Sequence, residues 1–214
     1  MQLYSYWRST TSFRVRMALN LKGITCELVP VDLIADDQRA PSYLKLNRGA
    51  GVPTLVLDDG TVLTQSMAII DYLDSTWPEP SLIPDDPMLR TRVLALAHTI
   101  ALDVHPVNNL RVLRQLKSRF QATQDDVRDW VQHWMVEGFT AAESLIEGNS
   151  KFAFGNVGPG LADICLAAQS YNALRWDVDL SAFPKVQRIT ENTLQLPAVQ
   201  AAHPDNQPEA KVTP

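Results

Sequence analysis

Short apolar runs and one-sided helical spacings alternate over the first eighty residues. Four apolar runs are expected as strands: residues 2–6, 26–33, 53–57 and 61–63. Apolar residues at helical spacing predict helices between them: residues 12–22, 38–46 and 66–75. Asp58-Asp59-Gly60 separates the last two runs and is a strong hairpin signal. The resulting order, β-α-β-α-β-β-α, indicates one mixed sheet with helices on its faces.

Residues 77–87 (WPEPSLIPDDP) interrupt this pattern, because four prolines there make a regular element improbable. Beyond them the periodicity is helical throughout: residues 88–118, 124–148, 160–173 and 184–195. A short helix near 197–202 and a loose proline-rich tail should follow. We therefore expect an α/β domain of residues 1–80 and an all-helical domain of residues 88–214, with residues 77–87 as the linker.

Composition agrees with two cores, since 214 residues with 45% hydrophobic and 20% charged side chains are ordinary for a globular chain. A net charge of −5 gives no general attraction to nucleic acid or anionic lipid. No apolar run reaches the length of a membrane span, and a cytoplasmic location is expected. Cys26 and Cys165 lack metal-ligand spacing, so they are expected as buried apolar residues and no metal is expected.

Four consecutive hydroxyl residues, Ser9, Thr10, Thr11 and Ser12, stand where the first strand gives way to a helix. One of them is enough to cap the helix, which is the simplest interpretation. A helix start also offers free N–H groups, so hydroxyl donors beside it could stabilise an anion such as a thiolate. The segment holds no cysteine, so a thiol would have to arrive with a ligand.

WRSTTSFRVRMAL around this turn is similar to the signature of the zeta-class glutathione transferase family, Ser-Ser-Cys-Ser followed by Trp-Arg-Val-Arg. Further likeness extends over nearly the whole chain: ALNLKG (18–23), VPTL (52–55), QSMAIIDYL (65–73), HPVNNLRVL (105–113), GLADICL (160–166) and VDLSAFP (178–184). The resemblance implies a thioredoxin-like first domain, a helical-bundle second domain and a homodimer. It also implies that glutathione is the cofactor.

The resemblance assigns Ser9 the hydroxyl that bonds the glutathione sulfur, with Thr10 and Ser12 lining the same turn and Thr11 in place of the signature cysteine. It implies a cis Pro53, with Val52 pairing the cysteinyl backbone; a plain strand-start proline is the alternative. Other glutathione contacts implied are Gln65 and Ser66 at the γ-glutamyl carboxylate and Gln38 at the glycyl end. Without the family, Gln65-Ser66 would be taken as helix capping. Residues 48–51 (RGAG) depart from the family pattern.

Arginines suit a dicarboxylate substrate because the guanidinium binds carboxylates in a bidentate manner. By resemblance Arg8 and Arg175 hold substrate carboxylates, and His105, Asn108 and Arg111 line the substrate pocket. Taken alone, each arginine is more readily explained as a solvated or salt-bridged surface residue. Pro106 lies mid-helix, where it should force a kink. Gly160 replaces the usual hydroxyl cap of a later helix, which predicts a weaker cap.

The resemblance implies a glutathione-dependent cis-trans isomerase of a maleyl diacid, with maleylacetoacetate as the first choice of substrate and maleylpyruvate as the nearest alternative. A thiolate would add to the cis double bond, the bond would rotate, and the thiolate would leave. Glutathione transfer to α-halo acids is a further alternative within the enzyme class. A non-catalytic glutathione-fold binding protein is the alternative from another class, although it would not need Ser9, Arg8 and Arg175 together.

Overall fold

The computed structural model describes residues 1–155 and 157–211. The chain forms two compact units, one made of Met1–Leu82 together with the chain from Gln195 onward, the other of Ile83–Leu194. The sequence division placed everything after residue 87 in the second domain. The structure instead places the chain from Gln195 onward in the first unit, because the helix Pro197–Ala202 packs against the helix Thr10–Leu21.

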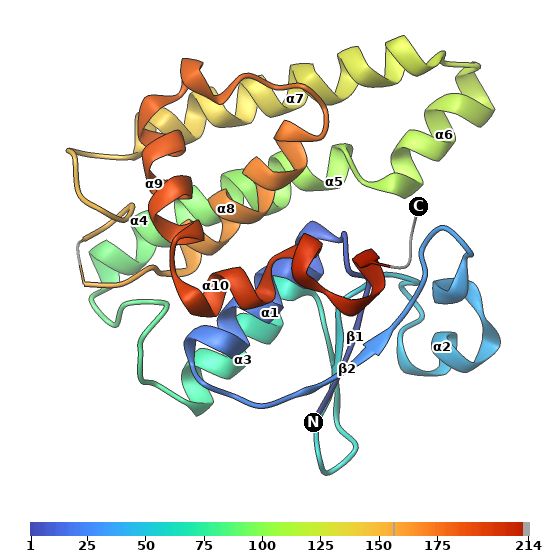
Figure 1. Ribbon diagram of the computed structural model, residues 1–214, viewed down its shortest axis with the longest axis horizontal. Coiled ribbons are helices and arrows are strands. Elements are labelled where there is room, and N and C mark those ends of the chain that lie inside the picture. Colours follow the sequence, from blue (N-terminus) through green and yellow to red (C-terminus); the bar gives the residue numbers. More distant parts are fainter. Residues whose placement is uncertain (156, 212–214) are drawn as a thin grey trace. The chain divides into compact units, whose positions relative to one another are not determined.

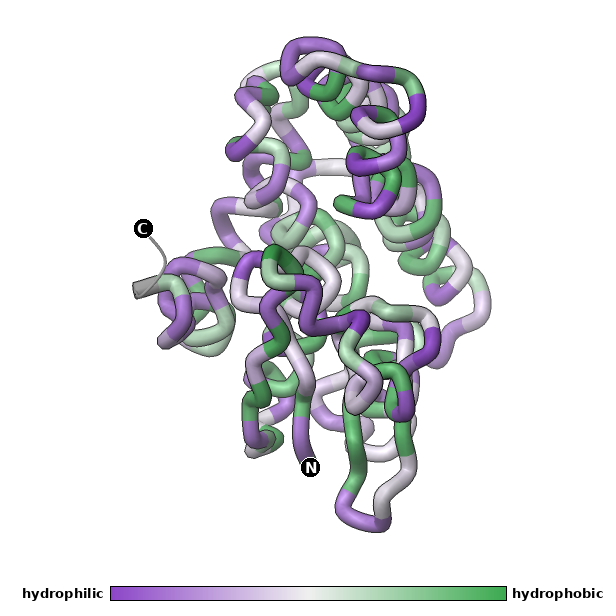
Figure 2. Tube along the Cα trace, turned by 90° about the vertical axis from the view of Figure 1, so that its right-hand side faces the viewer, coloured by the Kyte–Doolittle hydropathy of each residue, from purple (hydrophilic) through white to green (hydrophobic). Residues whose placement is uncertain are grey.

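A four-stranded mixed sheet forms the centre of the first unit, in the order β2-β1-β3-β4. Its strands are β1 (Gln2–Ser5), β2 (Glu27–Pro30), β3 (Thr54–Val56) and β4 (Val62–Thr64). β1 pairs parallel with β2 and antiparallel with β3, and β3 pairs antiparallel with β4. Figure 2 shows the β3–β4 hairpin with apolar strands and a hydrophilic turn, where Asp58-Asp59-Gly60 was expected. The predicted order of strands and helices is confirmed.

Helices cover both faces of this sheet, with α1 and α3 on one face and α2 on the other (Figure 1). Their bounds are α1 (Thr10–Leu21), η1 (Asp37–Arg39), α2 (Pro41–Leu46), α3 (Ser66–Thr76), α10 (Pro197–Ala202), η4 (Pro204–Asn206) and η5 (Pro208–Lys211). The core includes Leu3 and Leu55 from the sheet and Phe13, Ile69 and Leu73 from the helices, all fully buried. The site-bearing start of α1 is therefore anchored by a packed apolar face.

The expectation of a loose tail is wrong for residues 203–211. The His203 ring lies edge-on to the Phe13 ring at 5.6 Å between centroids. Gln207 is buried and its Nε2 donates to the carbonyls of Ala201 and His203. Two short 3-10 helices, η4 and η5, and the side-chain amide of Gln207 order this segment, a pattern that hydrophobic periodicity does not detect. The remainder of the expected tail, residues 212–214, lies outside the described residues.

The second unit is helical in its described part: α4 (Pro87–His98), η2 (Thr99–Val104), α5 (His105–Val107), α6 (Leu110–Phe120), α7 (Gln124–Leu145), α8 (Leu161–Leu174), η3 (Leu180–Ala182) and α9 (Pro184–Leu194). The expected single helix of residues 88–118 is instead divided. Pro106 has no N–H to donate, and just before it the His105 amide reaches the Ile100 carbonyl five residues back, so η2 is a π-helical segment. Asn109 then caps α6.

Gly138 of α7 lies directly against η2. A Cβ placed on Gly138 would come within 1.9 Å of Val104 Cγ2, and Val104 is itself 1% exposed. No side chain larger than hydrogen fits at residue 138 without displacing Val104. Gly138 therefore sets how closely α7 packs against η2, the segment that precedes His105.

The start of α8 is capped from one side only, since Gly160 has no side chain to contribute. Asp163 accepts hydrogen bonds from the backbone N–H groups of Gly160 and Ala153, each at 2.8 Å. The carboxyl is almost completely buried, and this desolvation raises the pKa of Asp163 to about 6 in spite of the two donors. In the described part of the chain, no helix is both long and apolar enough to cross a bilayer.

Replacing Asp163 by asparagine should change how stability depends on pH. Since the folded pKa lies above the unfolded value, the folded state binds the proton more tightly between about pH 4 and 6. The wild type should therefore gain stability relative to Asp163→Asn as pH falls through this window, by up to about 1.4 kcal/mol per pH unit. Urea unfolding of both proteins from pH 7 to 4 measures this. Parallel curves would contradict the raised pKa.

Candidate functional site

The turn of four hydroxyl residues forms the junction between β1 and α1, as the sequence predicts. Ser9 is the N-cap of α1, and its Oγ accepts a hydrogen bond from the Ser12 backbone N–H at 3.2 Å. The Ser9 side chain is partly exposed. A partly exposed hydroxyl at a helix N-terminus is in position to meet an anionic ligand atom.

Thr11 extends this turn toward the loop before β3. Its Oγ1 lies 2.8 Å from Ser9 Oγ and donates to the Val52 carbonyl oxygen at 2.7 Å. Ser9, Thr11 and Val52 are thus joined in one chain of hydrogen bonds. The other two hydroxyl residues lie deeper, since Thr10 is 5% exposed and Ser12 is fully buried. Ser12 consequently reaches the Ser9 hydroxyl through its backbone N–H and not through its side chain.

The loop before β3 carries a cis Val52-Pro53 bond, as the resemblance implied. Among the described residues, none accepts a hydrogen bond from the Val52 amide, so an extended peptide could pair with it. Tyr43 and Asn47 of the α2 region both donate to the Gly51 carbonyl. The sequence did not predict these two hydrogen bonds to Gly51. Arg48, in the stretch that departs from the family pattern, is exposed.

Gln65 and Ser66 open α3, where backbone strain marks the junction. Gln65 has φ 71°, a region that side-chain-bearing residues seldom adopt, while Ser66 is the first helical residue and is buried. Gln38 is also buried; its Nε2 donates to Asp36 Oδ1, and its Oε1 has no partner among the described residues. A buried amide oxygen without a donor is costly, and a ligand N–H would relieve that cost.

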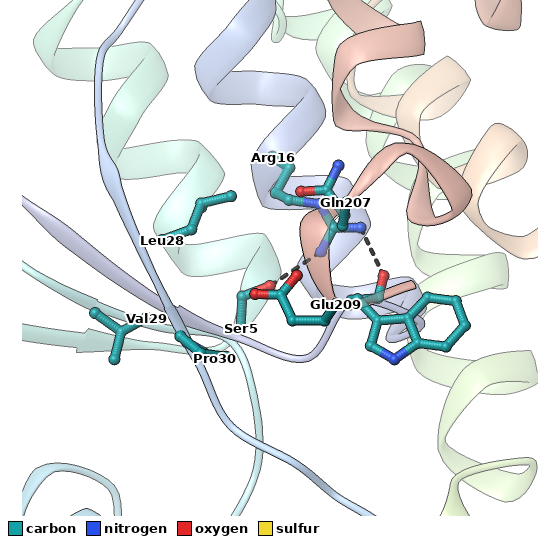
Figure 3. A pocket seen from close by; sticks show the side chains of 8 residues that line it. Ser5, Arg16, Leu28, Val29, Pro30, Gln207 and Glu209 are labelled. Carbon is teal, nitrogen blue, oxygen red and sulfur yellow. Dashed lines mark hydrogen bonds between the residues drawn. The ribbon is translucent and has the colours of Figure 1, made fainter. Parts of the chain in front are cut away.

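Arg16 is a positioning residue that the sequence analysis missed. It is 2% exposed, and its Nη2 donates to the Trp7 carbonyl at 2.9 Å while its Nη1 donates to Ser5 Oγ at 3.0 Å. Figure 3 shows these two bonds beside a small pocket that Gln207 and Glu209 also line. Its Nε donates to the Ala202 carbonyl at 3.0 Å. One guanidinium therefore fixes the backbone just before Ser9 to the C-terminal segment.

The remaining predicted residues are described unit by unit. In the first unit, Arg8 is partly exposed and its guanidinium lies 5.2 Å from the Trp7 ring centroid. In the second, Asn108 is 7% exposed, and neither its Nδ2 nor its Oδ1 has a partner among the described residues. His105 Nε2 lies 3.5 Å from Asn109 Nδ2. The structure thus leaves a buried amide beside the proline break with its hydrogen-bonding capacity unused.

Two exposed arginines complete the predicted set. Arg111 lies in the first turn of α6, and its backbone N–H donates to Asn109 Oδ1 at 3.2 Å. Arg175 follows α8, where its Nη1 donates to Asn172 Oδ1 at 3.4 Å and its guanidinium lies 6.0 Å from the Tyr171 ring. Both guanidinium groups reach solvent, as a residue that meets a charged small molecule must.

Cysteine and metal chemistry have little support among the described residues. No three His, Cys, Asp or Glu side chains there gather as they would around a metal ion. Cys165 is buried, as expected, but Cys26 is only half-buried, which corrects the expectation for that residue. Burial nonetheless raises the pKa of the Cys26 thiol, so little thiolate forms there at neutral pH. A thiolate at Ser9 would have to belong to a ligand.

Comparisons with a family model, with curated proteins and with solved structures all point to the same family. The family model of the glutathione S-transferase N-terminal domain matches residues 8–76. A maleylacetoacetate isomerase of Pseudomonas aeruginosa is 43% identical over 211 residues, which cover 98% of each chain. The holo structure of a maleyl pyruvate isomerase, described as a bacterial zeta-class glutathione S-transferase, has a TM-score of 0.94 at 38% identity and covers 98% of this chain and 99% of its own. A maleylacetoacetate isomerase from Methylobacterium extorquens, solved with malonate and glutathione bound, also has a TM-score of 0.94, at 37% identity and the same coverage.

Proposed function

Because this chain belongs to the zeta class of the glutathione transferase family, we propose that it is a glutathione-dependent cis-trans isomerase that converts maleylacetoacetate to fumarylacetoacetate. The observation that carries the proposal is Ser9, a partly exposed hydroxyl at the N-terminus of α1, joined through Thr11 to Val52 beside a cis proline. Maleylpyruvate is the second candidate substrate, favoured by the likeness to the maleyl pyruvate isomerase structure.

The first unit has residues that fit glutathione along its length. Ser9 offers an O–H to the sulfur, the Val52 amide offers an N–H to the cysteinyl backbone, and Ser66 with the start of α3 offers donors to the γ-glutamyl carboxylate. Gln38 Oε1 would take a donor near the glycyl end. When bound, glutathione supplies a thiolate that adds reversibly to the cis double bond, which permits rotation and release of the fumaryl product.

The chain's own residues would stabilise charge at both ends of this reaction. Ser9 and the N-terminus of α1 lower the pKa of a thiol placed beside them, because both favour the anion. We assign the substrate carboxylates to Arg8 and Arg175, since a guanidinium fits a carboxylate better than an ammonium does. His105, Asn108 and Arg111 are assigned to substrate recognition, and the unused amide of Asn108 supports this most directly.

Ser9→Ala should lower kcat/KM with maleylacetoacetate by about 10²–10³-fold, since it removes a hydrogen-bond donor to a developing anion. Ser9→Thr keeps both the O–H and the helix cap and is the matched control. Absorbance assays with maleylacetoacetate and with maleylpyruvate, each with and without glutathione, measure the rates. Full activity of Ser9→Ala would remove the role assigned to Ser9. No glutathione-dependent turnover of either diacid would defeat the proposed function.

A cytoplasmic homodimer is proposed on the same resemblance. The two cysteines are not joined in a disulfide, which is usual in a reducing compartment. Neither nucleic acid nor a membrane is proposed as a partner, given the net charge of −5. Sedimentation of the purified protein measures the assembly state.

A further inference from the structure

We propose that Thr11 is a positioning residue that couples two contacts with the ligand. When the ligand backbone binds at Val52, Thr11 strengthens the hydrogen bond that Ser9 donates to the ligand sulfur. This inference rests on the proposed function, because it takes glutathione as the ligand. It concerns the one position of the hydroxyl turn where this chain has threonine and the family signature has cysteine.

The direction of the hydrogen bonds in the ligand-free turn follows from counting hydrogens. A threonine hydroxyl has one hydrogen, and a carbonyl oxygen can only accept. Since Thr11 Oγ1 donates to the Val52 carbonyl at 2.7 Å, the 2.8 Å contact between Thr11 and Ser9 requires Ser9 to be the donor. Ser9 Oγ in turn accepts from the Ser12 N–H. The single hydrogen of Ser9 is therefore directed to Thr11 and away from any ligand.

A ligand N–H group that donates to the Val52 carbonyl changes the direction of these hydrogen bonds. The cysteinyl N–H gives the Val52 carbonyl a new donor, so Thr11 can turn its hydrogen away without leaving that acceptor unpaired. Thr11 then donates to Ser9 Oγ, and Ser9 donates to the sulfur anion. The reversal requires rotation about two C–O bonds only, because Ser9 Oγ and Thr11 Oγ1 already lie within hydrogen-bond distance.

The reversed direction of the hydrogen bonds, from Thr11 to Ser9 to the sulfur, favours the thiolate for two reasons. A hydroxyl that accepts a hydrogen bond becomes a stronger donor, so Thr11 strengthens the bond that Ser9 makes. A hydrogen bond to an anion is also stronger than one between neutral groups, so the sulfur anion stabilises the hydrogen bonds in this direction. A cysteine at position 11 would do this less well, because the S–H group is a weak donor.

The test measures the pKa of the enzyme-bound thiol from its thiolate absorbance, with two ligands and three proteins. The ligands are glutathione and its depsipeptide analogue, in which an ester oxygen replaces the cysteinyl N–H. The proteins are the wild type, Thr11→Ser, which keeps the hydroxyl, and Thr11→Val, which keeps the shape without it. Calorimetry of glutathione binding provides the affinity of each protein in parallel.

We expect the wild type and Thr11→Ser to hold the thiol of glutathione about one pKa unit below that of the analogue, a tenfold difference in the ionisation equilibrium. In Thr11→Val this difference should vanish, and the bound pKa of glutathione should rise by about one unit. A difference that persists in Thr11→Val, or equal values for both ligands in the wild type, would overturn the proposal. The comparison of the two ligands in the wild type requires no variant. The proposed function fails separately, if the wild type binds glutathione without lowering its thiol pKa.

Discussion

Replacing Arg16 by methionine is expected to lower the free energy of unfolding by about 3–5 kcal/mol, the cost of breaking a buried charged hydrogen-bond network from one side. Methionine keeps much of the apolar stem but leaves Ser5 Oγ and the carbonyls of Trp7 and Ala202 without their donor. Urea unfolding at pH 7 measures the change. The chain after residue 195 should also be cleaved faster by a protease, since one of its attachments is lost.

Two further variants serve as controls. One tests whether the planar guanidinium of Arg16 is needed or only its charge, and the other tests whether the loss is specific to a buried arginine. Arg16→Lys keeps the positive charge but cannot reach several acceptors with a planar group, so it should recover only part of the loss. Arg119→Met removes an exposed arginine of α6 and should change stability by less than about 0.5 kcal/mol. A loss below 1 kcal/mol in Arg16→Met would show that water replaces the guanidinium at little cost.

Gly138→Ala should cost about 2–3 kcal/mol, although alanine is the better helix former by about 1 kcal/mol. The new Cβ would overlap Val104 Cγ2 at 1.9 Å, and Val104 is a β-branched residue buried in η2 with little rotational freedom. α7 and η2 must therefore separate or distort. Urea unfolding gives the change in stability.

The double variant Gly138→Ala, Val104→Ala is the matched control for this overlap. Val104→Ala alone leaves a cavity, while in the double variant the added methyl occupies the space that Val104 has vacated. The two changes should therefore be strongly non-additive, with the double variant more stable than Gly138→Ala. Additive losses would mean that the overlap with Val104 does not cause the destabilisation.

Much of the first unit could be predicted from local sequence. The strands, the hairpin at Asp58-Asp59-Gly60 and the helix after Ser9 all follow from periods and turn residues within a few positions of each other. The division of residues 88–118 could not be predicted as fully. Pro106 predicts a kink, but local spacing does not show that the segment before it is π-helical or that Val104 in this segment lies against Gly138 of another helix.

The candidate site shows the same limit. Ser9, Thr10, Thr11 and Ser12 were visible as candidates because they are adjacent in the sequence. The bond from Thr11 to Val52 joins residues 41 positions apart, and that from Arg16 to Ala202 joins residues 186 apart. No spacing rule relates such pairs, since they meet only when the sheet and its helices have formed. The sequence could therefore predict candidate side chains, but it could not predict which backbone carbonyls accept hydrogen bonds from them.

The return of α10 to α1 has a consequence for how the protein is made. During synthesis, β1 to α3 emerge from the ribosome well before Pro197–Ala202 exist. Until those last residues arrive, Arg16 lacks its Ala202 acceptor and one side of α1 lacks its covering helix. The first unit can therefore be completed only after the whole second unit has been translated, and in the meantime the uncovered side of α1 is open to non-native contacts.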